Sequence, residues 1–339
     1  MEGTLIGIDL GSKFVKVCKV INDGKKSSLS ILCAMTMSSS DTAFQKMALL
    51  SILKKLKIDS DASFLAVGGQ GLIHRDLLVS KKIDKKNLKN VIKLEVEQSI
   101  TEDLDKMFSS FTITKDISEE ECNVLFSAVP RDQIFSKVHV VKNVQNLKLV
   151  GITMESLALV NAFNTFGPSY KNTESIILVN IGHTKTNITV LNNKELIFMR
   201  DVEFGGKDVT SDISNLYTIP EKLAEEIKRR TDLWNDIGFN VKNVLKKSTA
   251  TLLEAIFRTI EHCITRQYIV AVDRVVITGG GAMLEGIDVF IGDTLGIATN
   301  KWNPLIDNNV TGYVNQNYGY FMPISLGLAI EKEFDNVQN

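Results

Sequence analysis

Short apolar runs that end in glycine occur at three distant places along the chain. They span residues 5–11, 176–182 and 275–281. Each run has the composition of a buried β-strand, and the backbone amides at a glycine turn can form a concave site for an anion such as phosphate. A single such segment is more often only a turn. The recurrence and the order of the segments therefore predict a chain built around a nucleotide.

The first two of these segments are near-duplicates. In each, a polar residue, Asp9 or Asn180, stands two positions before the turn glycine, Gly11 or Gly182, and a second apolar strand follows. Two such turns facing each other would hold a phosphate chain from both sides. The third segment has no acidic position and presents the bare backbone of residues 279–281, which suits the close approach of a base or a sugar.

Between these segments the hydrophobic pattern alternates between the periods of strands and helices. Strands are expected at 107–114 and 122–130, and helices at 41–56, 88–100, 132–146, 220–230 and 244–268. A fourth strand with a glycine turn, at 64–71, has no acidic partner and is not assigned to the nucleotide. The alternation predicts an α/β fold of two lobes that share one cleft.

Composition and charge set limits on the function. With 339 residues and 44% hydrophobic content, the chain is long enough for about two domains. A net charge of −1 gives no electrostatic footprint for nucleic acid. The four cysteines are scattered and do not cluster with the four histidines, which fits a reducing cytoplasm and predicts no zinc site. No run reaches the ~18 apolar residues of a membrane span, so membrane attachment would need a partner.

The order of the glycine segments resembles the actin-like ATPase superfamily, which includes actin, the heat-shock chaperone ATPases, sugar kinases and FtsA. Residues 151–163 and 323–330 resemble the two connecting helices of that superfamily. Within it, the chain is similar to the PilM family of type IV pilus assembly proteins, through GIDLGS at 7–12 and EVEQSI at 95–100. The resemblance runs from about residue 4 to residue 330.

The resemblance implies an actin-like ATPase fold with an inserted small α+β subdomain, as in FtsA and PilM. The first lobe would comprise residues 1–175 and 322–339, and the second lobe residues 176–321. The partner-binding insert would cover about residues 22–147, including the fourth glycine turn.

ATP with Mg²⁺ is the cofactor that the resemblance implies. Asp9 would hold Mg²⁺ through water, because magnesium prefers oxygen ligands and keeps much of its hydration. Lys16 would contact the β- and γ-phosphates, Glu225 and Lys228 would bind the ribose, and Glu155 would position the attacking water. Without the resemblance, Lys16 is only an exposed strand lysine, and Glu225 with Lys228 is an ordinary i,i+3 helix pair. The expected cofactor-binding residues are Asp9, Gly11, Ser12, Lys16, Gly182, Thr186, Gly205, Gly206, Glu225, Lys228, Gly279, Gly280 and Gly281.

Asn180 departs from the superfamily pattern, which has aspartate at this position in most members. An amide still forms hydrogen bonds, but it supplies no negative charge to help bind a metal or orient water. Besides Glu155, Asn180 is therefore the position that bears on catalysis. We expect ATP to serve as a switch or structural cofactor, with slow or no hydrolysis.

The favoured function is a cytoplasmic adaptor that binds the short N-terminal cytoplasmic tail of a PilN-like single-span protein. It would thereby join an inner-membrane pilus assembly complex, as a monomer or a homo-oligomer. Alternatives are an FtsA-like polymerising division protein, whose basic amphipathic anchor is missing from the polar residues 331–339, and an adaptor of a related secretion system. A small-molecule kinase lacks an identifiable base, and Asp9 and Lys16 argue against a domain that has lost its nucleotide.

Overall fold

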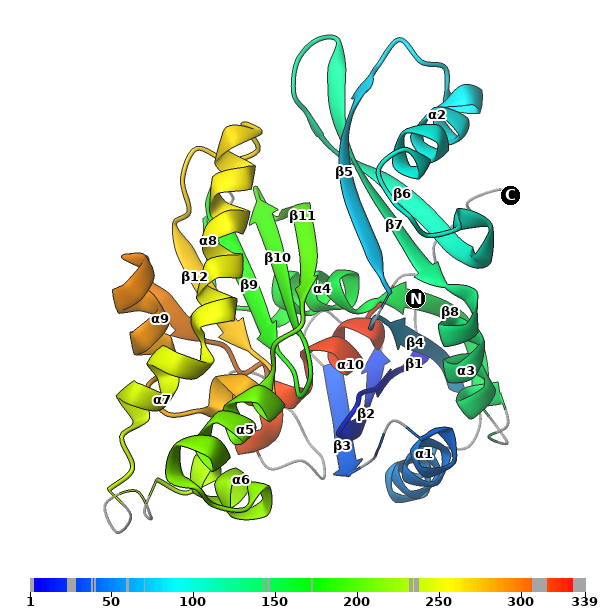
Figure 1. Ribbon diagram of the computed structural model, residues 1–339. Helices are drawn as coiled ribbons and strands as arrows, with labels where there is room; N and C mark the ends of the chain where they lie inside the picture. Colours follow the sequence, from blue (N-terminus) through cyan, green and yellow to red (C-terminus); the bar gives the residue numbers. More distant parts are fainter. Residues whose placement is uncertain are drawn as a thin grey trace.

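Each lobe of the computed structural model contains one five-stranded sheet, and the two sheets are similar (Figure 1). The three predicted glycine segments lie on inner strands of these sheets, one in the first sheet and two in the second. The first sheet has the strand order β3-β2-β1-β4-β8. The hairpin of β1 and β2 is antiparallel, whereas β4 lies parallel to β1. The strands are β1 (Gly3–Leu10), β2 (Phe14–Asn22), β3 (Leu29–Met37), β4 (Asp61–Val67) and β8 (Leu147–Met154). The structure describes residues 3–22, 29–37, 39, 41–58, 61–69, 71–142, 144, 147–171, 173–231, 234, 238–306 and 316–331.

The second sheet repeats this arrangement, with the order β11-β10-β9-β12-β13. Its hairpin of β9 and β10 is antiparallel, and β12 lies parallel to β9. The two glycine hairpins therefore hold the same place in their sheets, as their duplicated sequence pattern indicates. The strands are β9 (Ser175–Ile181), β10 (Thr186–Asn192), β11 (Glu195–Val202), β12 (Arg274–Thr278) and β13 (Thr299–Lys301).

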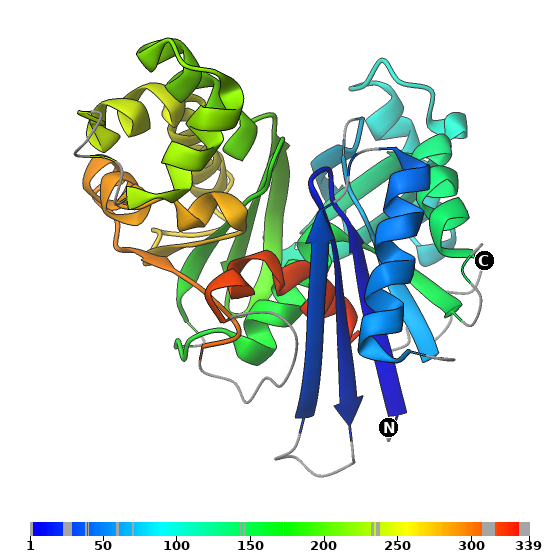
Figure 2. The same cartoon turned by 90° about the horizontal axis from the view of Figure 1, so that it is seen from below.

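Two helices, α4 (Glu155–Phe166) and α10 (Pro323–Leu328), pack between the two sheets (Figure 2). Phe163 and Leu326 belong to one apolar core with residues of both lobes. The approach of the helices is close, because a Cβ at Gly327 would lie 1.7 Å from the carbonyl oxygen of Ala158. The predicted first connecting helix begins later than expected, since its first four residues, 151–154, belong to strand β8.

The remaining helices cover the outer faces of the sheets. On the first lobe, α1 (Thr42–Leu56) and α3 (Arg131–Lys142) bury their apolar sides on the sheet. The second lobe carries α5 (Gly206–Tyr217), α6 (Glu221–Arg229), α7 (Val241–Ser248), α8 (Ala250–Thr265) and α9 (Ile287–Leu295), with short 3₁₀ turns η3 (Gly280–Met283) and η4 (Gln316–Phe321).

The single helix expected at 244–268 is two helices. α7 ends and α8 begins at Thr249, whose hydroxyl donates to the carbonyl oxygen of Leu245 at 2.7 Å. The apolar positions keep a helical period through this break, so the sequence pattern does not reveal it.

A small unit stands apart from both main sheets. Its antiparallel sheet has the order β5-β7-β6 and is covered by α2 (Lys85–Glu97) and the 3₁₀ turn η1 (Leu104–Lys106). The strands are β5 (Ile73–Ser80), β6 (Met107–Asp116) and β7 (Glu121–Pro130). We call these residues, 73–130, the insert. The range expected from the sequence, 22–147, is wider and takes in β3, α1 and β4, although β3 and β4 pair with strands of the first sheet.

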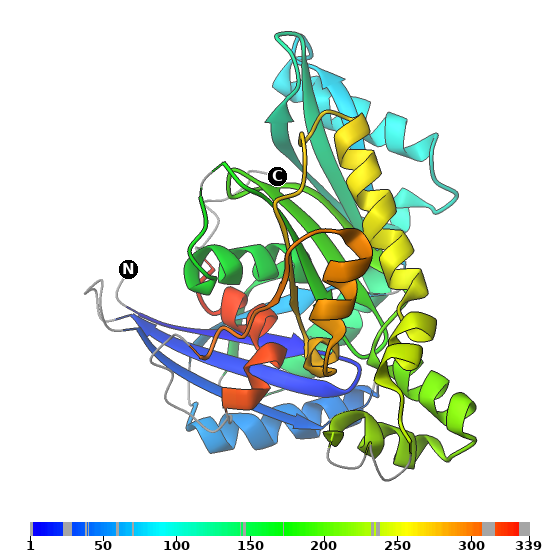
Figure 3. The same cartoon turned by 90° about the vertical axis from the view of Figure 1, so that its left-hand side faces the viewer.

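The insert also touches the second lobe at the end of α8 (Figure 3). The Asp76 carboxylate contacts Nε2 of His262 and accepts from the hydroxyl of Tyr268, both at 2.8 Å. The insert is thus tied to both lobes. Among the helices that the structure describes, none combines the length and the apolarity that a bilayer span needs.

Candidate functional site

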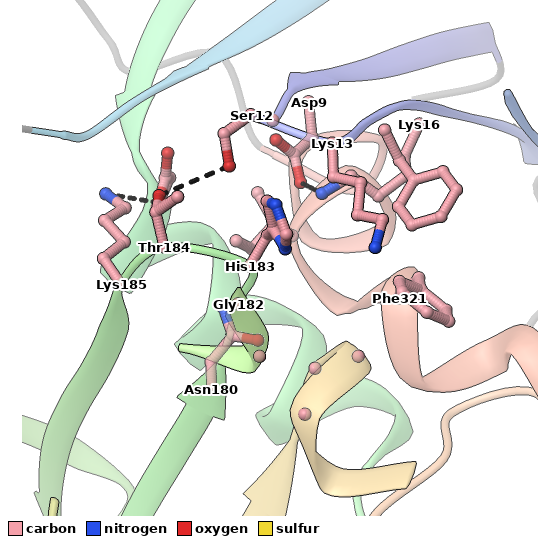
Figure 4. A pocket seen from close by; sticks show the side chains of 18 of the residues that line it. Asp9, Ser12, Lys13, Lys16, Asn180, Gly182, His183, Thr184, Lys185 and Phe321 are labelled. Carbon is pink, nitrogen blue, oxygen red and sulfur yellow. Dashed lines mark hydrogen bonds and ion pairs between the residues drawn. The ribbon is translucent and has the colours of Figure 1, made fainter. Parts of the chain in front are cut away.

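A cavity of about 1030 Å³ lies between the lobes, where the two glycine hairpins meet (Figure 4). It is lined by the turns after β1 and β9, by η3, and by parts of α3, α4, α5 and α6. We call it the cleft. Residues from distant parts of the sequence thus come together at one site of suitable size for a nucleotide.

Most of the residues expected at the nucleotide line this cleft. They are Asp9, Gly11, Ser12, Lys16, Glu155, Asn180, Gly182, Gly206, Glu225, Lys228, Gly279, Gly280 and Gly281. Thr186 and Gly205, which were also expected at the nucleotide, do not line the cleft. The buried Thr186 hydroxyl donates to the carbonyl oxygen of Phe204 at 2.8 Å, and the Gly205 amide donates to the carboxylate of Asp208 at 2.8 Å. Both residues lie outside the lining of the cleft, and their contact with a ligand stays a prediction.

The two hairpin turns face each other and are closed in the same way. The Gly11 amide donates to the carbonyl oxygen of Phe14 at 3.0 Å, and the Gly182 amide donates to that of Lys185 at 2.9 Å. The Ser12 and Thr184 hydroxyls are 3.3 Å apart across the cleft (Figure 4). The duplicated pattern therefore builds two opposed turns with matching geometry.

The first hairpin carries an ion pair. Asp9 and Lys16 are opposite each other in the register of β1 and β2, and their Oδ2 and Nζ atoms are 2.5 Å apart. Asp9 is 1% exposed, so this ion pair is buried on the carboxylate side. Lys16 lines the cleft while neutralising Asp9.

The second hairpin carries an amide pair in the equivalent place. Asn180 and Asn187 are opposite each other in the register of β9 and β10, and Nδ2 of Asn180 donates to Oδ1 of Asn187 at 3.3 Å. Asn187 in turn donates to the carboxylate of Asp201. The second hairpin thus has uncharged asparagines where the first hairpin has the charged Asp9 and Lys16.

Glu155 lies at the start of α4 between two lysines. Its Oε2 is 2.8 Å from Nζ of Lys185, and its Oε1 is 3.7 Å from Nζ of Lys137. Burial acts to raise the pKa of Glu155, but the charges of the two lysines outweigh burial and hold this pKa at about 2. Lys185 also contacts Asp201 at 3.4 Å. Glu155 is therefore a paired carboxylate, which makes it a weak base toward water.

Glu225 on α6 joins the two sides of the cleft. Its Oε1 is 2.6 Å from Nζ of Lys13, in the first lobe, and its Oε2 is 2.6 Å from Nζ of Lys228. It also accepts from the hydroxyl of Thr210 at 2.5 Å and contacts Arg229. Burial alone would raise the pKa of Glu225, but the Lys228 and Lys13 charges lower it well below its usual range.

The third glycine segment packs against the protein itself. A Cβ at Gly280 would lie 2.4 Å from the ring of Phe321, and one at Gly281 would lie 2.1 Å from the side chain of Ile181. Gly279 has a φ of 82°, in the region that favours glycine. Close packing within the chain thus accounts for these glycines, and contact with a base or sugar stays a prediction.

The donors around Asp9 do not fit a Mg²⁺ ion held by the protein. Magnesium is usually bound by one or two free carboxylates together with phosphates and water. Here the Asp9 carboxylate contacts an ammonium group, and Asn180 offers only an amide. Among the residues described, no group of three or more His, Cys, Asp or Glu side chains converges as a site for a metal ion.

Several residues that line the cleft were not predicted from the sequence. Lys13, Lys137 and Lys185 line it, and so do Gly68 and Gly69, from the fourth glycine turn that was expected in the insert. A Cβ at Gly68 would lie 2.6 Å from the Glu155 carboxyl carbon, so this turn borders the Glu155 cluster. Only Lys13 had a local signal, because it directly follows Ser12 in the first turn.

Two lobes with the same sheet order around one cleft, with helices packed between them, define the actin-like ATPase fold. The chain belongs to the type IV pilus assembly protein PilM family, whose model matches residues 7–332.

Solved structures agree with this fold. One, described as a PilM-PilN type IV pilus biogenesis complex, superposes with a TM-score of 0.78 at 18% identity, over 97% of this chain and 98% of the other. The ethanolamine utilization protein EutJ from Carboxydothermus hydrogenoformans gives a TM-score of 0.55 at 16% identity, over 96% and 89% of the two chains. The archaeal actin homolog Ta0583 gives 0.50 at 12% identity, over 96% and 98%.

Proposed function

We propose that this protein is a nucleotide-binding adaptor of type IV pilus assembly. It would be held at the cytoplasmic face of the inner membrane by the N-terminal tail of a PilN-like single-span protein. Membership of the PilM family supports the role in pilus assembly. The similar structure described as a PilM-PilN complex supports the partner.

The cleft is the proposed site of ATP. Two opposed glycine turns suit a chain of phosphates, because such turns form concave anion sites and the Ser12 and Thr184 hydroxyls face each other there. Lys16 would contact the phosphates, and Glu225 with Lys228 would bind the ribose. Glu155 is paired with Lys185, and Asn180 carries no charge, so ATP would be hydrolysed slowly or not at all. ATP would then act as a switch or a structural cofactor.

An exposed strand edge beside an aromatic pair is the observation that carries the adaptor role. β6 is the last strand of the insert sheet, and its outer edge pairs with no strand that the structure describes. Phe108 on β6 meets Phe135 on α3 with ring centroids 5.7 Å apart, and Arg131 lies over the Phe108 ring. Phe108 and Phe135 are 42% and 58% exposed, so together they present apolar surface to solvent that a partner could cover.

A tail peptide would add a strand to the β6 edge and place an apolar side chain on the aromatic pair. Main-chain hydrogen bonds would give affinity, and the pair would give specificity. The pair lies where the insert meets the first lobe, since Phe135 comes from α3 and Phe108 from the insert.

Helix α3 connects this docking surface to the cleft. Phe135 contacts Phe108, and Lys137, two residues further along, contacts Glu155 in the cleft. A change in the cleft that moves Lys137 would therefore act on the same helix that presents Phe135. This link offers a physical route by which ATP would control the tail.

The test is a binding titration of the full chain with a synthetic peptide of the PilN-like tail from the same genome, in the presence of ATP. We expect Phe108→Ala and Phe135→Ala each to weaken binding by about tenfold. Phe257→Ala is the matched control, because Phe257 is 54% exposed on α8 of the second lobe and belongs to neither β6 nor α3. No binding by the native chain would refute the adaptor role, and equal binding by the variants would refute the docking surface.

A second candidate, self-association as in FtsA-like proteins, is favoured by the outer face of α1. Phe44, Met47 and Leu50 are 62%, 67% and 45% exposed there. Such an apolar helix face on a surface is typical of an interface. Light scattering over a concentration series would detect oligomers, and Met47→Glu should abolish them. A single monomeric mass for the native chain at all concentrations would exclude this candidate.

A further inference from the structure

His183 lines the cleft in the second hairpin turn, and it has no role in the nucleotide site proposed above. It directly follows Gly182, as Ser12 directly follows Gly11 in the first turn. Among the histidines that the structure describes, it is the one that lines the cleft. In the duplicated pattern, an imidazole therefore stands where the first hairpin has a serine expected at the nucleotide.

The backbone of His183 is fixed, while its ring has no partner among the residues that the structure describes. The carbonyl oxygen of His183 accepts from the Lys207 amide at 2.8 Å, and that of Gly182 accepts from the Gly206 amide at 2.9 Å. The turn is thereby held against the start of α5. Figure 4 shows the ring pointing from this turn toward the first hairpin. The two ring nitrogens are thus available to a ligand between the hairpins.

The charged groups around this ring keep it neutral at pH 7. Lys13 acts on it from the first hairpin turn and Lys207 from α5, while Lys228 and Glu225 act from α6. Burial, followed by the charges of Lys13 and Lys228, lowers the pKa of His183 to about 4. Glu225 acts in the opposite direction but does not outweigh them. The surrounding side chains therefore disfavour a proton on the ring.

A polyphosphate between the hairpins would change the sign of this surrounding charge. The hairpin residues Asp9 and Lys185 are already in ion pairs with Lys16 and Glu155. An anion close to an imidazole favours its charged form and so raises its pKa. A phosphate beside His183 would therefore favour a proton on the ring, and the imidazolium donates hydrogen bonds from both nitrogens.

On the basis of the nucleotide site proposed above, we infer that the His183 imidazole contacts a phosphate of ATP and takes up a proton when ATP binds. The proton comes from solvent, and no covalent bond forms or breaks. Because the complex holds more protons than the free protein, ATP binds more tightly as the pH falls toward the pKa of His183 in the complex. His183 thereby makes nucleotide binding sensitive to pH.

The experiment is isothermal titration calorimetry with ATP at pH 7 and a fixed Mg²⁺ concentration, in PIPES and in Tris buffer. These buffers differ in ionisation enthalpy, so the difference between the observed binding enthalpies gives the number of protons taken up. We expect the native chain to take up about half a proton more than His183→Gln. Glutamine keeps a hydrogen-bond donor but cannot be charged. From about pH 8 to about pH 6, the affinity of the native chain should rise about tenfold relative to that of the variant.

His139→Gln is the matched control, because His139 is exposed on α3 and does not line the cleft. It should match the native chain in proton uptake and in affinity. Thermal unfolding confirms that each variant is folded. Imidazole NMR spectra of the native chain give a second measurement that needs no variant, since the His183 signal should titrate at a higher pH with ATP than without it.

Equal proton uptake by the native chain and by His183→Gln, with both proteins binding ATP, would overturn the role of His183 and leave the nucleotide site standing. An unchanged titration midpoint of the His183 signal in the ATP complex would overturn it in the same way. Absence of ATP binding by the native chain would overturn both the role of His183 and the nucleotide site.

Discussion

Asn180 holds in the second hairpin the position that Asp9 holds in the first. Each lies opposite the residue that would reach toward the ligand, Lys16 for Asp9 and Asn187 for Asn180. The first pair is an ion pair at 2.5 Å, and the second is an amide hydrogen bond at 3.3 Å. One half of the duplicated site thus carries charged side chains, and the other half carries neutral ones.

We expect ATP hydrolysis by the native protein to be slower than ~1 s⁻¹, the lower end for dedicated enzymes. Asn180→Asp restores a carboxylate, but Glu155 stays paired with Lys185, so the single variant should gain little. The double variant with Lys185→Ser leaves Glu155 with only the more distant Lys137, and it should be the fastest of the three. Steady-state phosphate release measures all of them. A native rate typical of dedicated enzymes, or a double variant no faster than the native protein, would contradict this account.

The hairpins and the fold class could be predicted from the sequence because their signals are local. An apolar strand, a polar residue and a turn glycine lie within a few positions, and the same order occurs twice. The equivalence of Asp9 and Asn180 follows from that order. The family resemblance then indicated the actin-like architecture.

The Glu155 cluster could not be predicted, because its members meet only through tertiary packing. Lys137 comes from α3, Lys185 from the second hairpin and Gly68 from the end of β4. No periodicity links these positions. The predicted insert range, 22–147, is wider than the separate small sheet for the same reason, since the sequence does not show that β4 pairs with β1.

Gly206→Ala should separate ligand contact from folding. A Cβ at Gly206 would have no neighbour in the protein closer than 3.6 Å, and alanine favours the helix that begins there. We expect thermal stability without ligand to be unchanged or slightly higher, while ATP affinity falls by about tenfold, because the methyl group would enter the cleft. At Gly205 a Cβ would lie 2.5 Å from the backbone of His183, so Gly205→Ala should lose stability instead. Unchanged affinity in Gly206→Ala would place the nucleotide away from α5.

Glu155 should make the free energy of unfolding depend on pH. Its pKa is about 2 in the folded protein and 4.5 in an unperturbed chain. A lowered pKa means that this contribution is complete above about pH 4.5 and is lost as the pH falls toward about 2. Urea unfolding should show Glu155→Gln less stable than the native protein by about 3 kcal/mol at pH 7, with a difference that shrinks below about pH 4.5. Glu226→Gln, at a side chain that is 56% exposed, is the control, and a pH-independent difference for Glu155→Gln would contradict the pairing.

The contact of Lys13 with Glu225 links the lobes across the cleft and should slow the entry of nucleotide. Lys13 lies in the first hairpin turn and Glu225 on α6, and their 2.6 Å ion pair must break if Glu225 is to bind a ribose. Lys13→Met leaves Glu225 paired with Lys228, so its cost in stability should be only about 1 kcal/mol.

Stopped-flow binding of a fluorescent ATP analogue should show faster association with Lys13→Met than with the native protein, because the cleft no longer has to break this contact to open. Arg229→Met is the matched control. Arg229 contacts the same carboxylate, but from the same helix and without crossing the cleft, so its removal should leave the association rate unchanged. Equal rates for the native protein and Lys13→Met would show that the ion pair does not hold the lobes together. Equal acceleration by both variants would assign the effect to the charge of Glu225 rather than to the link between the lobes.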